Sequence, residues 1–215
     1  MPREPRLLLS KSYYHVMVRG NNKMRVFHDA KDYHAYLDLI NRFKCEHPFD
    51  LFHYTLMPNH VHLLVHTLAA REFATFMKQL ALAYFHYYRQ RYSWTGHLWQ
   101  GRYKSQPVGK DAHFIQSGKY IELNAPRAGL VQKPGSWPWS SYHHYASGLT
   151  NPLITNDPFY ETLGGSATIR QQAYAALIVE DLIYQSYKLP VWGITRQRYA
   201  ERQKIHRKLN RRISR

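Results

Sequence analysis

Two histidines separated by one residue, His60 and His62, stand in an apolar stretch of the sequence. Alternate side chains of a strand share a face, so the two imidazoles would lie about 6.5–7 Å apart along the strand and could bind one divalent metal ion. The intervening Val61 and the following Leu63 would then face a layer of helices. Half-buried structural histidines on a sheet show the same pattern, and a chain with 14 histidines contains such spacings by chance. The pair alone leaves both interpretations open.

A second candidate pair is Tyr120 and Asn124, four residues apart in a segment expected to be helical. This spacing places them one turn apart on one face of the helix. A phenol there can act as a nucleophile, and an amide oxygen can complete a metal site. Glu122 lies between them in the sequence but points off their face, so it is not a predicted site residue. By itself the pair is also typical of an exposed helix surface.

The elements that must position these residues follow from hydrophobic periodicity and from turn and capping signals. Three strands and a fourth, extended basic segment are predicted over residues 12–19, 49–57, 60–67 and 99–108. Helices are predicted over residues 30–45 (capped by Asp29), 70–91, 110–124 and 166–188. The order β-α-β-β-α-(β)-α predicts an α+β fold, a ferredoxin-like antiparallel sheet with helices packed on one face, followed by a helical, basic C-terminal extension.

The composition indicates a polyanionic partner. The chain of 215 residues has a formal net charge of +16, and nine basic residues against one acid occupy positions 196–215. Residues 73–110 contain no acid and interleave basic with aromatic side chains, a combination that holds single-stranded nucleic acid. Five residues of this segment fall at helical spacing and are interpreted as core: Phe73, Met77, Leu80, Tyr84 and Tyr88. One cysteine, Cys45, excludes an intramolecular disulfide framework, and no apolar run is long enough for a signal peptide or a membrane span. A soluble, cytoplasmic protein without a membrane partner is expected.

Several short sequence motifs of this chain occur together in one known family. They are Tyr14-His15-Val16 with Arg19-Gly20-Asn21-Asn22, Met57-Pro58-Asn59-His60-Val61-His62-Leu63, Gln100-Gly101-Arg102-Tyr103-Lys104-Ser105, Tyr120-Ile121-Glu122-Leu123-Asn124 with Arg127-Ala128-Gly129-Leu130, and Trp139-Ser140-Ser141-Tyr142. In this order and spacing the chain resembles the single-tyrosine HUH transposases of bacterial insertion sequences, especially the REP-associated tyrosine transposases. The similarity covers residues 10–146. One departure is Asn124-Ala125-Pro126-Arg127, where the family usually has Asn-Pro-Val-Arg.

The resemblance implies a transposase domain over residues 1–147 and a C-terminal extension over residues 148–215. It implies that Tyr120 attacks single-stranded, hairpin-forming DNA and forms a 5′-phosphotyrosine link that later allows strand transfer. It also implies a divalent metal, Mg²⁺ or Mn²⁺, on His60, His62 and Asn124. A homodimer is possible, because family members include both dimers and monomers.

Four basic residues beside these motifs are candidate DNA contacts: Arg19, Arg102, Lys104 and Arg127. His15, on the first predicted strand, either neighbours the histidine pair or is a packed histidine, and the second interpretation is favoured. The alternative to an enzyme is a non-catalytic nucleic-acid-binding module on a ferredoxin-like sheet, which the basic and aromatic surface would serve equally well. For such a module, Tyr120→Phe would change binding little and would remove no activity.

Overall fold

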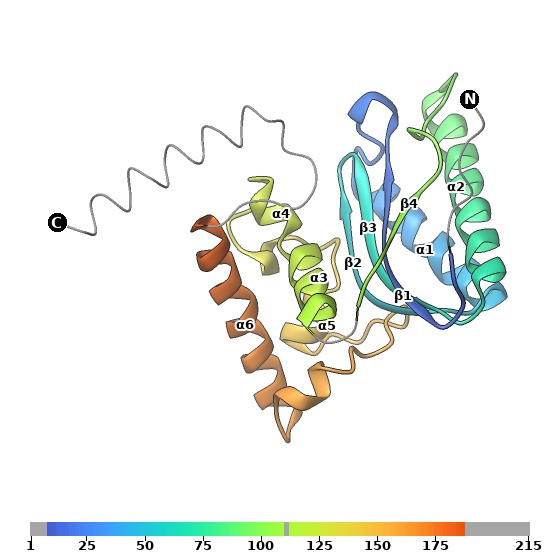
Figure 1. The fold of residues 1–215 in the computed structure, drawn as a ribbon. Helices are drawn as coiled ribbons and strands as arrows, with labels where there is room; N and C mark the ends of the chain where they lie inside the picture. Colours follow the sequence, from blue (N-terminus) through green and yellow to red (C-terminus); the bar gives the residue numbers. More distant parts are fainter. Residues whose placement is uncertain (1–7, 110–111, 188–215) are drawn as a thin grey trace. The chain divides into compact units, whose positions relative to one another are not determined.

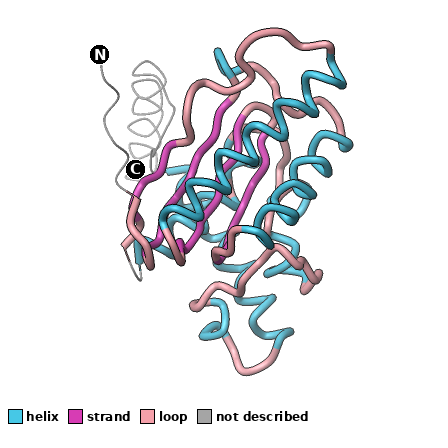
Figure 2. Tube along the Cα trace, turned by 90° about the vertical axis from the view of Figure 1, so that its right-hand side faces the viewer, coloured by secondary structure: helices cyan, strands magenta, loops and turns pink. Residues whose placement is uncertain are grey.

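The computed structural model describes residues 8–109 and 112–187 and contains one four-stranded antiparallel sheet (Figure 1). The strands β1 (Ser12–Arg19), β2 (Asp50–Met57), β3 (His60–Thr67) and β4 (Lys104–Pro107) lie in the order β2-β3-β1-β4. Helix α1 (Ala30–Glu46) connects β1 to β2, and α2 (Ala70–Tyr92) precedes β4. This is the predicted ferredoxin-like arrangement. Figure 2 shows the strands side by side beneath the helices.

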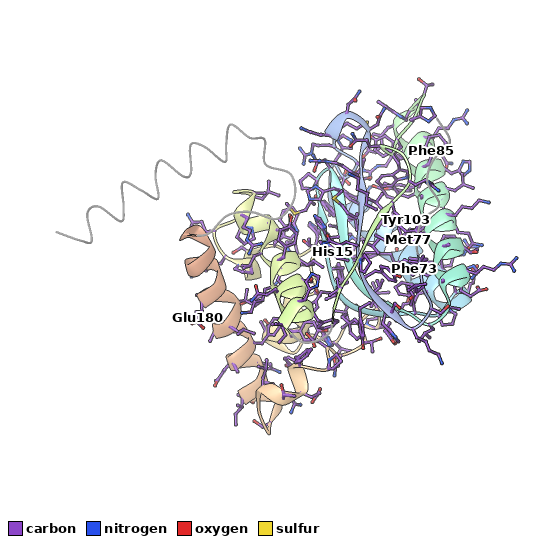
Figure 3. The ribbon with its side chains drawn as sticks, viewed as in Figure 1. His15, Phe73, Met77, Phe85, Tyr103 and Glu180 are labelled. Atoms are coloured by element: carbon purple, nitrogen blue, oxygen red, sulfur yellow. The ribbon has the colours of Figure 1, made fainter. Side chains whose placement is uncertain are left out.

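Helices α1 and α2 cover one face of the sheet, as Figure 1 shows. The strand residues on this face, among them Val16, Leu56 and Leu63, are almost fully buried against them. Figure 3 labels Phe73 and Met77 of α2 on this side and His15 of β1 on the side that faces α3 (Ala112–Glu122). The apolar face of α2 is therefore a core surface rather than a nucleic-acid surface.

Helix α3 packs on the opposite face, so the helices do not all lie on one face as the sequence predicted. Phe52 of β2 and Leu64 of β3 form a second, smaller core with Phe114 and Ile121 of α3. The physical reason is that β2 and β3 carry large apolar side chains on both faces, and both faces need cover. Because His60 and His62 share a face with Leu64, this second layer brings a helix to the histidine pair.

The helix predicted over residues 110–124 is interrupted near its end. Helix α3 ends at Glu122, Leu123 intervenes, and α4 (Asn124–Arg127) follows. Pro126 has no N–H to donate to the carbonyl of Glu122, and a proline ring crowds the carbonyl four residues before it, which breaks the helix there. The predicted first turn, Lys110 and Asp111, lies outside the described residues.

The segment after the sheet domain packs back onto it. The Leu153 side chain is buried in the main core, and the Thr155 N–H donates to the carbonyl of Leu51 at 2.8 Å. One compact unit therefore continues to Tyr174, and a second unit begins at Ala175. The predicted boundary at residue 147 stays a prediction. The remaining elements are α5 (Tyr142–Ser147), α6 (Ala167–Tyr187) and the 3-10 helices η1 (Asn21–Lys23), η2 (Pro134–Ser136) and η3 (Tyr160–Leu163).

The basic segment 196–215, part of the predicted helical C-terminal extension, lies outside the described residues, so its structure stays a prediction. Within the part of the chain that the structure describes, no helix combines the length and the apolar character that crossing a membrane requires.

Candidate active site

The two histidines of β3 lie on the face of the sheet that α3 covers. In the strand register His60 is opposite Arg19 and Met57, and His62 is opposite Met17 and Thr55. The two imidazole centroids are 4.8 Å apart with the rings nearly perpendicular. The predicted alternation, with the histidines on one face and Val61 and Leu63 in the helix-covered core, is confirmed.

Tyr120 of α3 lies directly against this pair. Its ring centroid is 5.7 Å from that of His62, and the two rings are perpendicular. The Asn124 side chain lies close enough to both the His60 ring and the Tyr120 phenol to influence their pKa values, and its Nδ2 donates to the Tyr120 carbonyl at 3.4 Å. The histidine pair and the tyrosine–asparagine pair, nearly 60 residues apart in the sequence, therefore lie side by side within a single chain.

One nitrogen of each imidazole is held by a neighbour. The Nδ1 atom of His62 shares a hydrogen bond of 2.8 Å with Nε2 of His15, and Nδ1 of His60 donates to Oδ1 of Asn59 at 2.6 Å. Such bonds fix the orientation and the tautomer of a ligating imidazole. They use neither Nε2 atom of His60 and His62. His15 is therefore more than a packed histidine. The register between β1 and β3 places it beside the pair, which is the alternative that the sequence left open.

Burial keeps these histidines neutral. It lowers the pKa of His15 to about 4, with a further contribution from His113, and the pKa of His60 to about 4, where the charge of Arg19 acts in the same direction. The pKa of His62 is also lowered well below 6.5, first by burial and then by His15 and His60. A neutral imidazole is the form that binds metal.

Positive charge surrounds the phenol. Burial raises the pKa of Tyr120, while the Asn124 hydrogen bond and the charges of Arg127 and Arg19 lower it. The guanidinium carbon of Arg127 lies 5.2 Å from the centroid of the Tyr120 ring. The Nε–H of Arg19 is buried and has no acceptor among the described residues. The site can therefore attract an anion beside the phenol.

The other two candidate DNA contacts come from the segment around β4. Lys104 is exposed and pairs with Met17, which also pairs with His62, so Lys104 belongs to the same face of the sheet as the histidines. Arg102 is exposed in the segment before β4. It lies outside the strand, so the register assigns it to neither face.

The donor set fits a divalent metal. Within residues 8–109 and 112–187, no group of three or more His, Cys, Asp or Glu side chains could hold one. The candidate is the mixed set of His60, His62 and Asn124, two neutral imidazoles and an amide that lie close together. Nitrogen and oxygen donors together suit Mn²⁺ and tolerate Mg²⁺.

A family model described as IS200-like transposase matches residues 8–124, which is more than half of the chain and includes His60, His62, Tyr120 and Asn124. The chain belongs to the IS200-like transposase family. This confirms the resemblance seen in the motifs, and it makes the protein a DNA-processing enzyme.

A curated relative supports this membership of the IS200-like transposases, and a solved structure has the same fold. A Haemophilus influenzae protein named as a candidate REP-associated tyrosine transposase is 30% identical over 124 residues, which cover 49% of this chain and 70% of that protein. A solved structure described as a REP-associated tyrosine transposase bound to a REP hairpin matches with a TM-score of 0.59 at 18% identity. It covers 73% of this chain and 93% of the other, and it shows the shared fold.

Proposed function

We propose that this IS200-like transposase cuts and rejoins single-stranded, hairpin-forming DNA through a covalent intermediate on Tyr120. The phenol oxygen attacks a backbone phosphorus, the bond from that phosphorus to the 3′ oxygen breaks, and the phenol proton ends on the leaving 3′ oxygen. The 5′ phosphate then stays on Tyr120 as a diester. Attack by a second 3′-hydroxyl reverses these changes and joins the strands without ATP.

The observation that carries this proposal is the position of Tyr120 against His62, with the Asn124 side chain beside both Tyr120 and His60. A tyrosine in a merely structural role needs no such neighbours. Burial alone would make the phenol a poor nucleophile, because it raises the pKa. The Asn124 hydrogen bond and the nearby guanidinium groups oppose that effect and support a nucleophilic role.

His60, His62 and Asn124 are the residues that would hold Mn²⁺ or Mg²⁺. When bound, the ion would supply positive charge that polarises the scissile phosphate. The chain itself contributes orientation: His15 and Asn59 hold the Nδ1 atoms of the two imidazoles, so that their Nε2 atoms stay available.

We propose that Arg19, Arg102, Lys104 and Arg127 contact DNA phosphates. The support is strongest for Arg19, whose Nε–H is buried beside His60 without an acceptor among the described residues, and for Arg127, which lies over the Tyr120 ring. The ligand of the solved relative is a REP hairpin, and we extend hairpin DNA to this protein. Since Tyr120 meets the histidines of its own chain, the site needs no second copy.

The test is covalent capture of DNA. The protein is incubated with a set of single-stranded hairpin oligonucleotides in Mn²⁺, in Mg²⁺ or in EDTA, and the products are separated on denaturing gels. We expect a protein–DNA adduct with either metal, none in EDTA, and none with Tyr120→Phe. Tyr13→Phe is the matched control, because Tyr13 lies on the same face of the sheet and packs against α3 through Phe114.

Two outcomes would contradict the proposal. An adduct that persists in Tyr120→Phe would assign the nucleophile elsewhere. Wild-type protein that binds the hairpins but forms no adduct with any of them would favour the non-catalytic binding module.

A further inference from the structure

A buried ionic cluster lies behind the nucleophile helix. The Nδ1 atom of His53 (β2) bonds to Oε1 of Glu122 at 3.0 Å, and its Nε2 atom bonds to Oδ2 of Asp157 at 3.0 Å. The relative exposures of His53, Glu122 and Asp157 are 1%, 2% and 6%. Buried charges are costly unless they are paired, so a triad of this kind in a small core calls for a reason.

The local backbone is arranged to aim His53 at α3. A β-bulge between Leu51 and His53 shifts the register with β3, so His53 pairs with Leu64 on the α3 face, whereas regular alternation would turn it toward α1 and α2. Gly118 of α3 makes room for the imidazole, because a Cβ atom there would lie 2.9 Å from Nε2 of His53. Bulge and glycine together allow the ring to enter between strand and helix.

Several elements converge on the two carboxylates. Oε1 of Glu122 also accepts hydrogen bonds from the Ser141 hydroxyl at 2.5 Å and from the Tyr174 hydroxyl at 3.5 Å. Asp157 caps its own turn by accepting from the Phe159 N–H at 2.7 Å. The hydrogen bonds and charges of the two carboxylates outweigh the burial of His53 and raise its pKa to about 9, so the ring carries a proton at neutral pH.

Glu122 lies at the break between α3, which carries Tyr120, and α4, which begins with Asn124. It is the last residue of α3, two positions after Tyr120 and two before Asn124, and the helix breaks immediately after it. Its side chain binds this break to His53 of β2, while Tyr120 and Asn124 lie against the histidines of β3, the neighbouring strand. Movement of the helix break relative to the sheet would shift the phenol and the amide together.

We propose that His53, Glu122 and Asp157 are positioning residues that lock the break between α3 and α4 onto the sheet and thereby set Tyr120 and Asn124 against His60 and His62. The inference rests on the proposed function and extends it to residues that touch neither DNA nor metal. It also gives the segment after residue 147 a role in the reaction, because Asp157 holds the far side of the imidazole.

The experiment compares Glu122→Gln and Asp157→Asn with wild type in the full-length protein. We measure the single-turnover rate of adduct formation, the affinity for the hairpin, and the affinity for Mn²⁺ alone by electron paramagnetic resonance. We expect the rate to fall about 10- to 100-fold in both variants, because small displacements of a nucleophile have effects of this size. Hairpin affinity should stay unchanged, and Mn²⁺ binding should weaken because Asn124 moves.

Glu72→Gln is the matched control. Glu72 bonds to Nδ1 of His47 at 2.6 Å, but it lies on α2, across the sheet from the active site. The same loss of a carboxylate from a histidine pair should there leave the rate and Mn²⁺ binding at wild-type values. If Glu122→Gln and Asp157→Asn only destabilised the protein, their melting temperatures would fall, and rate and hairpin affinity would fall together. That result would contradict a positioning role.

The outcomes separate this inference from the proposed function. An active wild type whose two variants keep its rate and its Mn²⁺ affinity would overturn the inference and leave the function intact. A wild type that forms no adduct would overturn the function, and Mn²⁺ affinity alone then decides on the positioning. Should Glu122→Gln fail to fold, Asp157→Asn carries the comparison, because it leaves the Glu122–His53 bond in place.

Discussion

The protonated His53 makes the stability of the protein depend on pH above neutrality. In the folded state its pKa is raised from 6.5 to about 9, because the bonds and charges of Asp157 and Glu122 outweigh burial. The folded protein thus binds this proton more tightly than the unfolded chain does. The stabilisation is complete below pH 6.5 and is lost as the pH rises through about 9. A shift of this size corresponds to about 3 kcal/mol of unfolding free energy.

The perturbation is His53→Gln, which removes the titrating group and keeps hydrogen-bonding capacity. Urea denaturation of wild type and variant across this pH range gives the free energy of unfolding of each. The difference between them cancels titrations that both proteins share. The other groups facing His53 are the phenols of Tyr145 and Tyr174, whose pKa values burial raises well above 10, so they stay neutral throughout.

We expect the stability advantage of wild type over His53→Gln to shrink by about 3 kcal/mol between neutral pH and pH values above 9. A difference that stays constant across the range would refute the reasoning, because His53 would then be neutral in the folded protein. An advantage that grows with pH would reverse the sign and would mean that the two carboxylates do not hold the proton.

Three further substitutions test the site. Gly118→Ala places a methyl group against the ring of His53 and should cost about 1–3 kcal/mol of unfolding free energy in urea titrations; wild-type stability would contradict the packing. His15→Ala removes the partner of Nδ1 of His62 and should weaken Mn²⁺ binding about 10- to 100-fold by electron paramagnetic resonance, whereas unchanged affinity would remove His15 from the site. Arg19→Ala should lower hairpin affinity and reduce the slope of log K against log salt by about 0.7; a slope equal to that of wild type would mean that Arg19 contacts no phosphate.

Much of the fold could be predicted from the sequence, because local signals were strong. The alternation around His60 and His62 marks β3, and Asp29 caps α1 by accepting a hydrogen bond from the Lys31 N–H, as predicted. The apolar period of the second long helix marks a core surface. The covering of both faces of the sheet was less accessible, because a mixed apolar and histidine strand does not reveal which side α3 covers.

The candidate site was predicted in part. The residues proposed to carry out the chemistry could be named, since their types and spacing are those of a known family, and the structure brings Tyr120 and Asn124 to the histidines. The residues that hold Tyr120 and Asn124 in place could not be predicted. Glu122 points off the face of Tyr120, and its partner His53 faces α3 only because of a bulge that no local pattern reveals. Asp157 joins the cluster from a distant segment, so only the tertiary structure links it to the site.

The most direct measurement of the central claim is the chemical location of DNA on the protein. After reaction with a hairpin in Mn²⁺, nuclease and trypsin digestion should leave a nucleotide linked through its 5′ phosphate to the peptide of residues 120–127. Trypsin releases this peptide by cleaving after Lys119 and after Arg127. Tandem mass spectrometry is predicted to assign the added mass to Tyr120. A nucleotide on any other peptide, or nicked DNA without any modified peptide, would contradict the account.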